Sequence, residues 1–186
     1  MLLPGIYKSA YHAVGVRNIV FVIWNGNLEM ETETDIRNWI IKTLSSENQA
    51  IGIYEAEVYW KKYPQDTFNV ILSDEKDHFC KMEQYLKDNA WTYSTFNKLG
   101  ISFYHFSGWI IGSILSLLPR KICFYLHTIA EKKAAREYGN IVEELSKNKE
   151  LEGKQQYHFK KLLQGMINNE NIHSEIFKYH SNIFHG

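Results

Sequence analysis

The chain has 186 residues, with 21 lysines and arginines balanced by 21 aspartates and glutamates. This neutral balance gives no electrostatic reason to expect a nucleic-acid partner, and two cysteines argue against a disulfide scaffold or a cysteine-rich zinc site. The length suits one domain with a sizeable core. Aromatic residues make up 15 % of the chain, which favours a large apolar ligand or a membrane surface in addition to a core.

The first 30 residues have a pattern that fits three structures. The apolar run Asn18–Trp24, closed by the turn signal Asn25-Gly26-Asn27, suits a strand, a short helix or an arm that touches a membrane. We expect residues 1–30 to form an extension packed on a domain that covers residues 31–186. The order of segments typical of a secretory signal is missing, so we do not expect secretion, and the few cysteines fit a reducing compartment.

Two long helices are expected next, separated by the turn Tyr63-Pro64-Gln65-Asp66. The first begins at an N-cap formed by Thr34-Asp35 and ends near Trp60, and the second runs from about Thr67 to Asn89. Each has an apolar stripe at helical spacing that contains acidic residues. A bare carboxylate is costly to bury unless it is paired or bound to a metal, so these acids need partners inside the protein. They are Glu47 in the first helix and Glu75, with His78 three residues later, in the second.

The segment Leu99–Leu118 differs from the others because it contains no Asp, Glu, Lys or Arg. Its 20 residues are close to the minimum for a membrane span, but serines, glycines and a histidine dilute its apolar character. Three interpretations stay open: a buried core helix, a helix partly inserted into one leaflet, and a true span.

Two further helices carry the remaining acidic residues. After Pro119 a helix places Glu131 beside the small residues Ala134 and Ala135, and a polar loop is expected over residues 146–153. The last helix runs from about Lys154 to Tyr179, and its apolar stripe again contains a glutamate followed three residues later by a histidine. These are Glu170 and His173.

Four helices thus each contribute a glutamate to the core side, and two add a histidine one turn later. Helix bundles build carboxylate-bridged di-iron or di-manganese centres in this way, because four carboxylates neutralise two divalent ions and each imidazole adds one nitrogen. We therefore expect an all-α, ferritin-like four-helix bundle with an additional apolar helix. Five further histidines lack such a pairing and are expected to be ordinary surface or core residues: His105, His127, His158, His180 and His185. The predicted metal ligands are Glu47, Glu75, His78, Glu131, Glu170 and His173.

These residues resemble the demethoxyubiquinone hydroxylases of ubiquinone biosynthesis, a family of ferritin-like di-iron proteins of the membrane surface. The similarity covers about residues 40 to 180. Two features depart from the family: Leu44-Ser45-Ser46 stands where an Asp-His-Ala-Gly run is usual, and Lys132 replaces a second acid. The shared motifs are Glu47-x-x-Ala50-x-x-Ile53-Tyr54, Glu75-Lys76-Asp77-His78, Leu99-Gly100, Glu131 with Tyr138 seven residues later, and Glu170-x-x-His173.

The resemblance implies a monooxygenase that uses O₂ and two iron ions, or manganese in their place, to hydroxylate a quinol or quinone ring. By the same resemblance Tyr138 lies near the site as a catalytic residue, and the additional apolar helix is membrane-interfacial and meets the bilayer. An unidentified electron donor is also required. The implied location is the cytoplasmic side of a membrane, or the matrix face of the inner membrane if the protein is mitochondrial. Assembly into a homo-oligomer is left open. The alternatives are a quinol oxidase of the alternative-oxidase type and a non-catalytic iron-binding protein.

Overall fold

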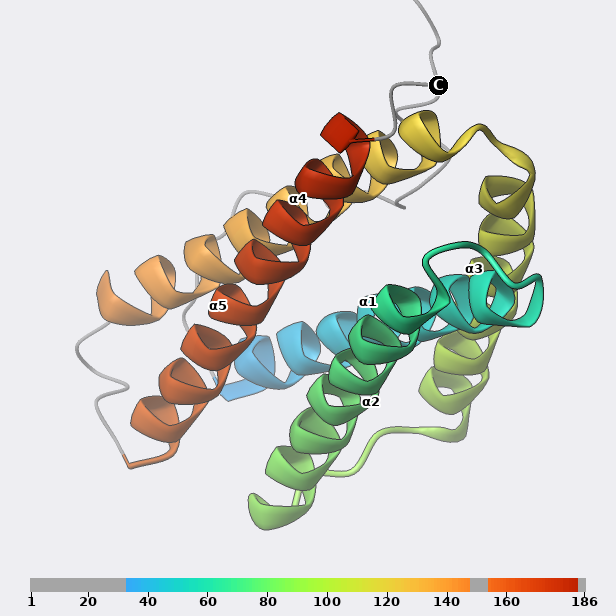
Figure 1. The fold of residues 1–186 in the computed structure, drawn as a ribbon. Helices are drawn as coiled ribbons and strands as arrows, with labels where there is room; N and C mark the ends of the chain where they lie inside the picture. The colour runs from blue at the N-terminus through green and yellow to red at the C-terminus, as the bar shows by residue number, and fades with distance from the viewer. Residues whose placement is uncertain (1–32, 148–153, 184–186) are drawn as a thin grey trace, which may run out of the picture.

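The structure is a computed structural model that describes residues 33–147 and 154–183, and these residues form helices and short connections without any strand (Figure 1). This confirms the all-α prediction. The expected extension over residues 1–30 lies outside the described residues, as does most of the expected loop over 146–153. The helices are α1 (Glu33–Tyr59), α2 (Gln65–Asp88), α3 (Thr95–Leu117), α4 (Arg120–Lys147) and α5 (Lys154–Ile183).

Local contacts explain where the helices start and stop. Pro64 precedes the first residue of α2, a position where its missing N–H costs no hydrogen bond. Ser94 caps α3 by accepting a hydrogen bond from the backbone N–H of Asn97, so this helix begins before the predicted start at Leu99. Helix α1 already includes Thr34 and Asp35, which were expected to precede it. The predicted boundaries were therefore wrong by a few residues at these two helix starts.

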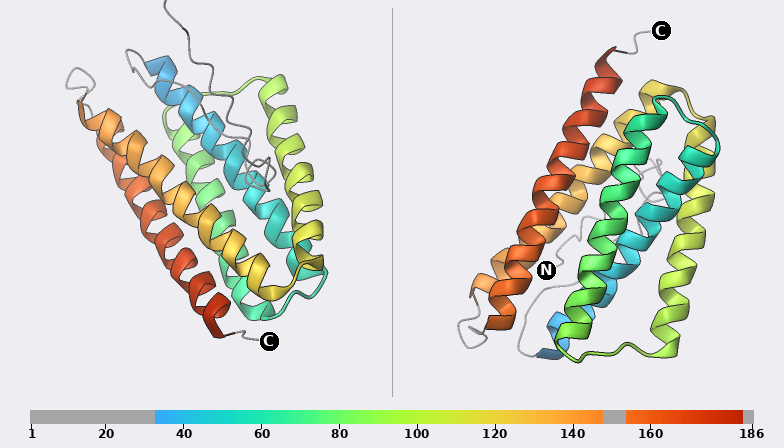
Figure 2. Two further views of the ribbon diagram at one scale, coloured as in Figure 1. Left: turned by 90° about the horizontal axis from the view of Figure 1, so that it is seen from above. Right: turned by 60° about the horizontal axis from the view of Figure 1, so that its bottom comes forward.

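The helices pair as in a ferritin-like bundle. Helix α1 packs against α2, and α4 packs against α5 (Figure 2). Helix α3 connects the end of the first pair to the start of the second and packs along α1. The result is a four-helix bundle with one additional helix on its outside, as the acidic pattern and the apolar segment predicted.

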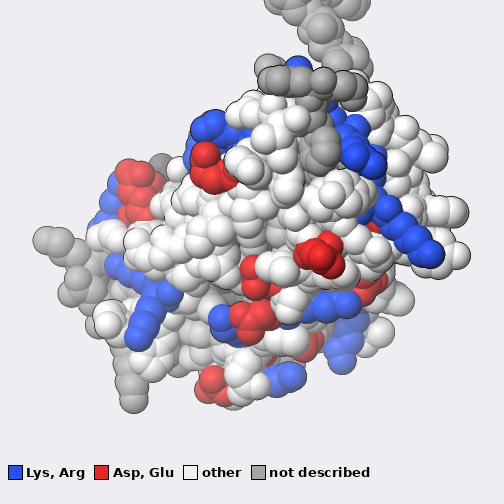
Figure 3. All heavy atoms as spheres, in the orientation of Figure 1, with Lys and Arg blue, Asp and Glu red and all other residues white. Residues whose placement is uncertain are grey.

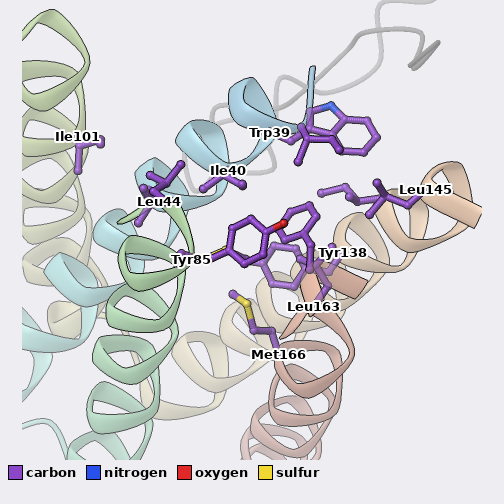
Figure 4. Packing of buried hydrophobic residues seen from close by; sticks show 14 residues of the cluster. Trp39, Ile40, Leu44, Tyr85, Ile101, Tyr138, Leu145, Leu163 and Met166 are labelled. Atoms are coloured by element: carbon purple, nitrogen blue, oxygen red, sulfur yellow. The ribbon is translucent and has the colours of Figure 1, made fainter. Parts of the chain in front are cut away.

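Two apolar clusters fill the bundle, and a third cluster of three buried residues lies where α1, α3 and α4 meet. The larger one contains Trp39, Leu44, Tyr85 and Met166 from three of the bundle helices (Figure 4). The smaller one is mainly aromatic and contributes Tyr54, Phe68, Ile71, Phe124 and Phe177. Buried polar side chains lie in the helices between these clusters, with apolar side chains above and below them.

Helix α3 lies very close to α1 because glycines face the contact. A Cβ atom on Gly108 would overlap the carbonyl oxygen of Gln49, and one on Gly112 would overlap that of Ile53. A third glycine, Gly52 of α1, is equally constrained by the backbone of α3 at His105. One side of α3 is therefore fixed to the bundle.

The opposite side of α3 carries a row of exposed apolar residues at helical spacing. No helix within residues 33–147 and 154–183 is both long and apolar enough to cross a membrane. Of the three interpretations of this segment, the true span was therefore wrong for the described helix. The exposed side chains, which we call the apolar face, are Phe96, Leu99, Phe103, Phe106, Ile110, Ile114 and Leu117.

Candidate metal centre

The six residues predicted as metal ligands converge inside the four-helix bundle, and all six are buried. They form two groups of four, each able to hold one metal ion, and both groups contain Glu75 of α2 and Glu170 of α5. Such overlap is what a pair of ions requires if two carboxylates are to bridge them. The first group adds Glu47 and His78, and the second adds Glu131 and His173. Together we call these six residues the central group.

The ring nitrogens of the two histidines face the carboxylates. His78 Nδ1 lies 3.4 Å from Glu47 Oε2 and 3.3 Å from Glu170 Oε1. On the other side, His173 Nδ1 lies 3.4 Å from Glu75 Oε1 and 3.8 Å from Glu170 Oε2. Each histidine is therefore within reach of Glu170, and the two rings lie 6.4 Å apart between centroids.

Several of these atoms are buried without any hydrogen bond from the described residues. They include one oxygen each of Glu47 and Glu75, and the Nδ1 atoms of both His78 and His173. Unpaired buried polar atoms are rare because each costs about 1–3 kcal/mol. Four carboxylates with only two imidazoles also leave an excess of negative charge. Two divalent cations would satisfy both the atoms and the charge, so the residues fit a di-metal centre.

The electrostatics agree with this reading. Burial, followed by repulsion from neighbouring carboxylates, raises the pKa of Glu75 and of Glu170 well above the ordinary glutamate value. Burial would lower the pKa of His173, but its contacts with Glu131, Glu170 and Glu75 raise it instead. Burial also opposes ionisation of Glu131, yet contacts with Glu170 and His173 lower its pKa to about 2. Without metal, protons must therefore neutralise part of this site.

Two polar side chains contact the histidines at Nε2, the ring nitrogen that does not face the carboxylates. Asp74 Oδ2 accepts a hydrogen bond from His173 Nε2 at 3.0 Å, which holds the ring with Nδ1 toward the carboxylates. The carboxamide of Asn169 lies 3.1 Å from His78 Nε2 in the corresponding place. Of the two aspartates in this part of α2, Asp77 instead pairs with Lys81 and is exposed. Spacing did not predict Asn169; its only sequence signal is its place next to Glu170.

Two buried tyrosines donate hydrogen bonds to the outer carboxylates. Tyr138 donates to Glu47 and Tyr54 donates to Glu131. Burial and the nearby carboxylates raise the pKa of both hydroxyls, so both stay protonated. The structure thus places Tyr138 directly against the central group. In the sequence Tyr54 was noted only as part of the motif that begins at Glu47, and its hydrogen bond to Glu131 is an additional contact.

A small cavity of about 30 Å³ adjoins the central group. Its wall includes Glu47, Glu131 and Tyr138 on the polar side and small or branched apolar residues, such as Ala130 and Leu115, on the other. That volume holds a water-sized molecule or O₂ but is too small for an aromatic ring. A ring-sized substrate therefore requires movement of the cavity wall.

Comparison with known proteins agrees with the geometry. The model of the family described as ubiquinone biosynthesis protein COQ7 matches residues 44–182, which includes all six residues of the central group. No individual curated protein and no solved structure matches the chain. The matched range agrees with the residues 40 to 180 over which the sequence resembles the demethoxyubiquinone hydroxylases. The chain therefore belongs to the COQ7 family, the demethoxyubiquinone hydroxylases of ubiquinone biosynthesis.

Proposed function

We propose that this protein is a membrane-associated di-iron monooxygenase that uses O₂ to hydroxylate a quinol or quinone ring. The observation that carries the proposal is the overlap of the two four-residue groups at Glu75 and Glu170. Glu47, Glu75, His78 and Glu170 would hold one ion, and Glu75, Glu131, Glu170 and His173 would hold the other. Membership of the COQ7 family supports the reaction class.

The bound iron pair would supply two electrons and the activation of O₂, and the protein supplies the surroundings. Asp74 fixes the orientation of His173 through its hydrogen bond at 3.0 Å. Tyr138 lines the cavity and holds a proton on its hydroxyl beside Glu47, where a reacting oxygen would need one. The apolar wall of the cavity excludes bulk water from the reaction. Manganese fits the same ligands, so the choice of iron rests on the family and on the reaction with O₂.

The surface supports a position at a membrane. Apolar residues such as Phe103 and Phe106 of the apolar face are more than half exposed, which is unusual for a row of this length. Figure 3 shows basic side chains grouped at the end of the molecule where the α1–α2 and α3–α4 connections meet. Arg120 lies there with its guanidinium 4.7 Å from the centre of the Tyr63 ring. Apolar, aromatic and basic residues together suit the boundary of a lipid leaflet.

The route to the centre would start from this surface. Leu115 belongs to α3 and also forms part of the cavity wall, beside Leu126 and Ala130 of α4. We infer that the quinone ring enters between α3 and α4 at this point while its tail stays in the membrane. Separation of these side chains would enlarge the cavity enough for the ring.

A single-turnover reaction tests the proposal. Iron-loaded protein is reduced under nitrogen, mixed with demethoxyubiquinol in detergent micelles, and exposed to isotopically labelled O₂. The expected product gains one labelled oxygen on the ring, while the second oxygen leaves as water. Oxidation of the quinol without a labelled product would indicate the quinol oxidase instead. Oxidation of iron alone would indicate an iron-binding protein, and either result would contradict the monooxygenase.

A further inference from the structure

A second buried set of metal-binding side chains lies outside the central group. It consists of Glu57 from α1 and Cys123 and His127 from α4, whose ligand atoms all lie within 4.8 Å of one another. Their side chains are 0 %, 0 % and 3 % exposed, respectively. We call these three residues the α1–α4 triad. The proposed reaction uses none of them.

The spacing of the triad suits coordination of one ion. His127 Nε2 lies 2.9 Å and Cys123 Sγ lies 3.2 Å from the same oxygen, Oε1 of Glu57. Ligands bound to one zinc ion at about 2.0–2.3 Å have similar separations from one another. Cys123 and His127 are four residues apart on α4, so both side chains face the same side of the helix. The other carboxylate oxygen, Glu57 Oε2, is buried and has no hydrogen bond from the described residues.

Charge balance favours a divalent ion. Burial would lower the pKa of His127, but the neighbouring Glu57 raises it well above its usual value, so the free triad pairs an imidazolium with a carboxylate. Burial keeps the Cys123 thiol protonated, because it raises the pKa of that group. Entry of one divalent cation would release the imidazolium proton and the thiol proton. The net charge of the buried triad would then be unchanged, which avoids a new desolvation cost.

From these contacts we propose that the α1–α4 triad is a third, mononuclear metal site that takes Zn²⁺ or a similar borderline-soft divalent ion. A ligand set of one thiolate, one imidazole and one carboxylate binds such ions in preference to Mg²⁺, Ca²⁺ or Mn²⁺. One side chain, that of Tyr54, connects the α1–α4 triad to the central group. The hydroxyl of Tyr54 lies 3.4 Å from His127 Nδ1 and donates to Glu131. The bound ion would thus fix His127, and through it the tyrosine that contacts the di-metal centre.

Cobalt titration tests the site directly. Co²⁺ bound to a thiolate gives a strong near-ultraviolet charge-transfer band, which the cysteine-free central group cannot produce. We expect full-length protein, purified without metal, to develop this band up to one thiolate-bound Co²⁺ per chain. Added Zn²⁺ should remove the band. Absence of a band at saturating Co²⁺ would overturn the proposal and leave the triad as a closed hydrogen-bonded cluster.

Two matched cysteine variants identify the thiolate that produces the band. Cys123→Ser should abolish it, whereas Cys80→Ser should keep it, because Cys80 is exposed on α2 and lies outside the triad. A band of equal size in Cys123→Ser would contradict the assignment. Circular dichroism checks that each variant is folded, and His127→Gln provides a second variant that retains the thiol but weakens Co²⁺ binding by at least about tenfold.

The result of the cobalt titration does not depend on the proposed oxygenase activity. Glu75→Ala removes a carboxylate shared by both halves of the central group but leaves the triad intact. This variant should keep the thiolate band although it loses the central pair of ions. Loss of the band in Glu75→Ala would show that the cobalt signal depends on the central group, and the triad would then not be a separate site.

Discussion

The central group and the α1–α4 triad are both buried sets of metal-binding side chains, but they differ in charge. The central group has four carboxylates against two histidines, and several of its atoms have no hydrogen bond from the described residues. The triad has one carboxylate opposite one imidazolium, and its cysteine and histidine both contact the same oxygen. In the central group metal would therefore replace protons held on the shared carboxylates Glu75 and Glu170, whereas in the triad it would replace the protons of His127 and Cys123. The groups that give up protons, and not burial alone, distinguish the two sites.

The largest effect is expected from Glu75→Ala. Because Glu75 belongs to both halves of the central group, its loss should remove both ions together and abolish turnover. Elemental analysis after anaerobic iron loading measures the iron content per chain. Asp77→Ala is a matched control, since Asp77 lies two residues away on α2 but is exposed and paired with Lys81. Full iron content in Glu75→Ala would break the assignment of the shared ligands.

Stability measured over a series of pH values tests the protonation of the central group. In the metal-free folded protein Glu75 and Glu170 have a raised pKa, so they stay protonated at pH values where the unfolded chain has ionised. The free energy of unfolding therefore falls as the pH rises above about 4.3, the unfolded value. His173 acts in the same direction, because its stabilising contribution is complete below about pH 6.5 and is lost as the pH rises through its raised folded pKa.

The measurement is the unfolding temperature of metal-free and metal-loaded protein between about pH 6 and pH 8. The metal-free protein should lose roughly 3–6 °C over this range, on the order of one pKa unit of linked free energy. Metal binding needs deprotonated ligands, so the stabilisation by added Mn²⁺ should grow with pH. Equal stabilisation at both ends of the range would contradict the protonated carboxylates inferred here.

A smaller effect is expected from Asp74→Ala. It removes the hydrogen bond at 3.0 Å that orients His173, and such outer contacts typically change metal affinity by about 10–100-fold. Competition with a chelator at fixed pH measures the affinity. The triad should keep its Co²⁺ band in this variant. An unchanged affinity of the central group would show that Asp74 is only a surface charge.

The smallest effect on either metal site is expected from changes to the apolar face. Phe103→Ser combined with Phe106→Ser should weaken binding to liposomes, by roughly tenfold or more from the lost apolar area. Iron content should not change. Tyr157→Ser is the control, because Tyr157 is an exposed aromatic residue on α5 and does not belong to that face. Unchanged liposome binding by the double variant would show that the apolar face does not dock on a membrane.

Much of the fold could be predicted because the bundle helices follow a single period. Apolar residues at helical spacing, interrupted by Glu47, Glu75 and Glu170, indicated both the core side of each helix and the convergence of the acids. That reasoning depends on a helix that buries one face. It held for α2 and α5, and the structure brings the six residues together as their spacing predicted.

The prediction from apolar spacing was incomplete for α1, which is buried on two sides. On a second face Gln49 and Ile53 meet the glycines of α3, and Ala56 and Glu57 are also buried; of these four residues only Ile53 was noted in the sequence. The missed glutamate is the one that pairs with His127, which was expected to be an ordinary histidine. The glycines at the helix contact are the local signal that a second helix approaches so closely. The partner of Glu57 lies on α4, so this pair depends on a tertiary contact that cannot be read from the spacing along α1.

The most direct test of the central claim is the number and coupling of iron ions in the central group. Anaerobic loading with Fe²⁺, in the Cys123→Ser background to exclude the proposed third site, is followed by elemental analysis and Mössbauer spectroscopy after oxidation. The account predicts two ions per chain that are magnetically coupled, because both would share Glu75 and Glu170 as ligands. One ion per chain, or two uncoupled ions, would contradict a carboxylate-bridged di-iron centre.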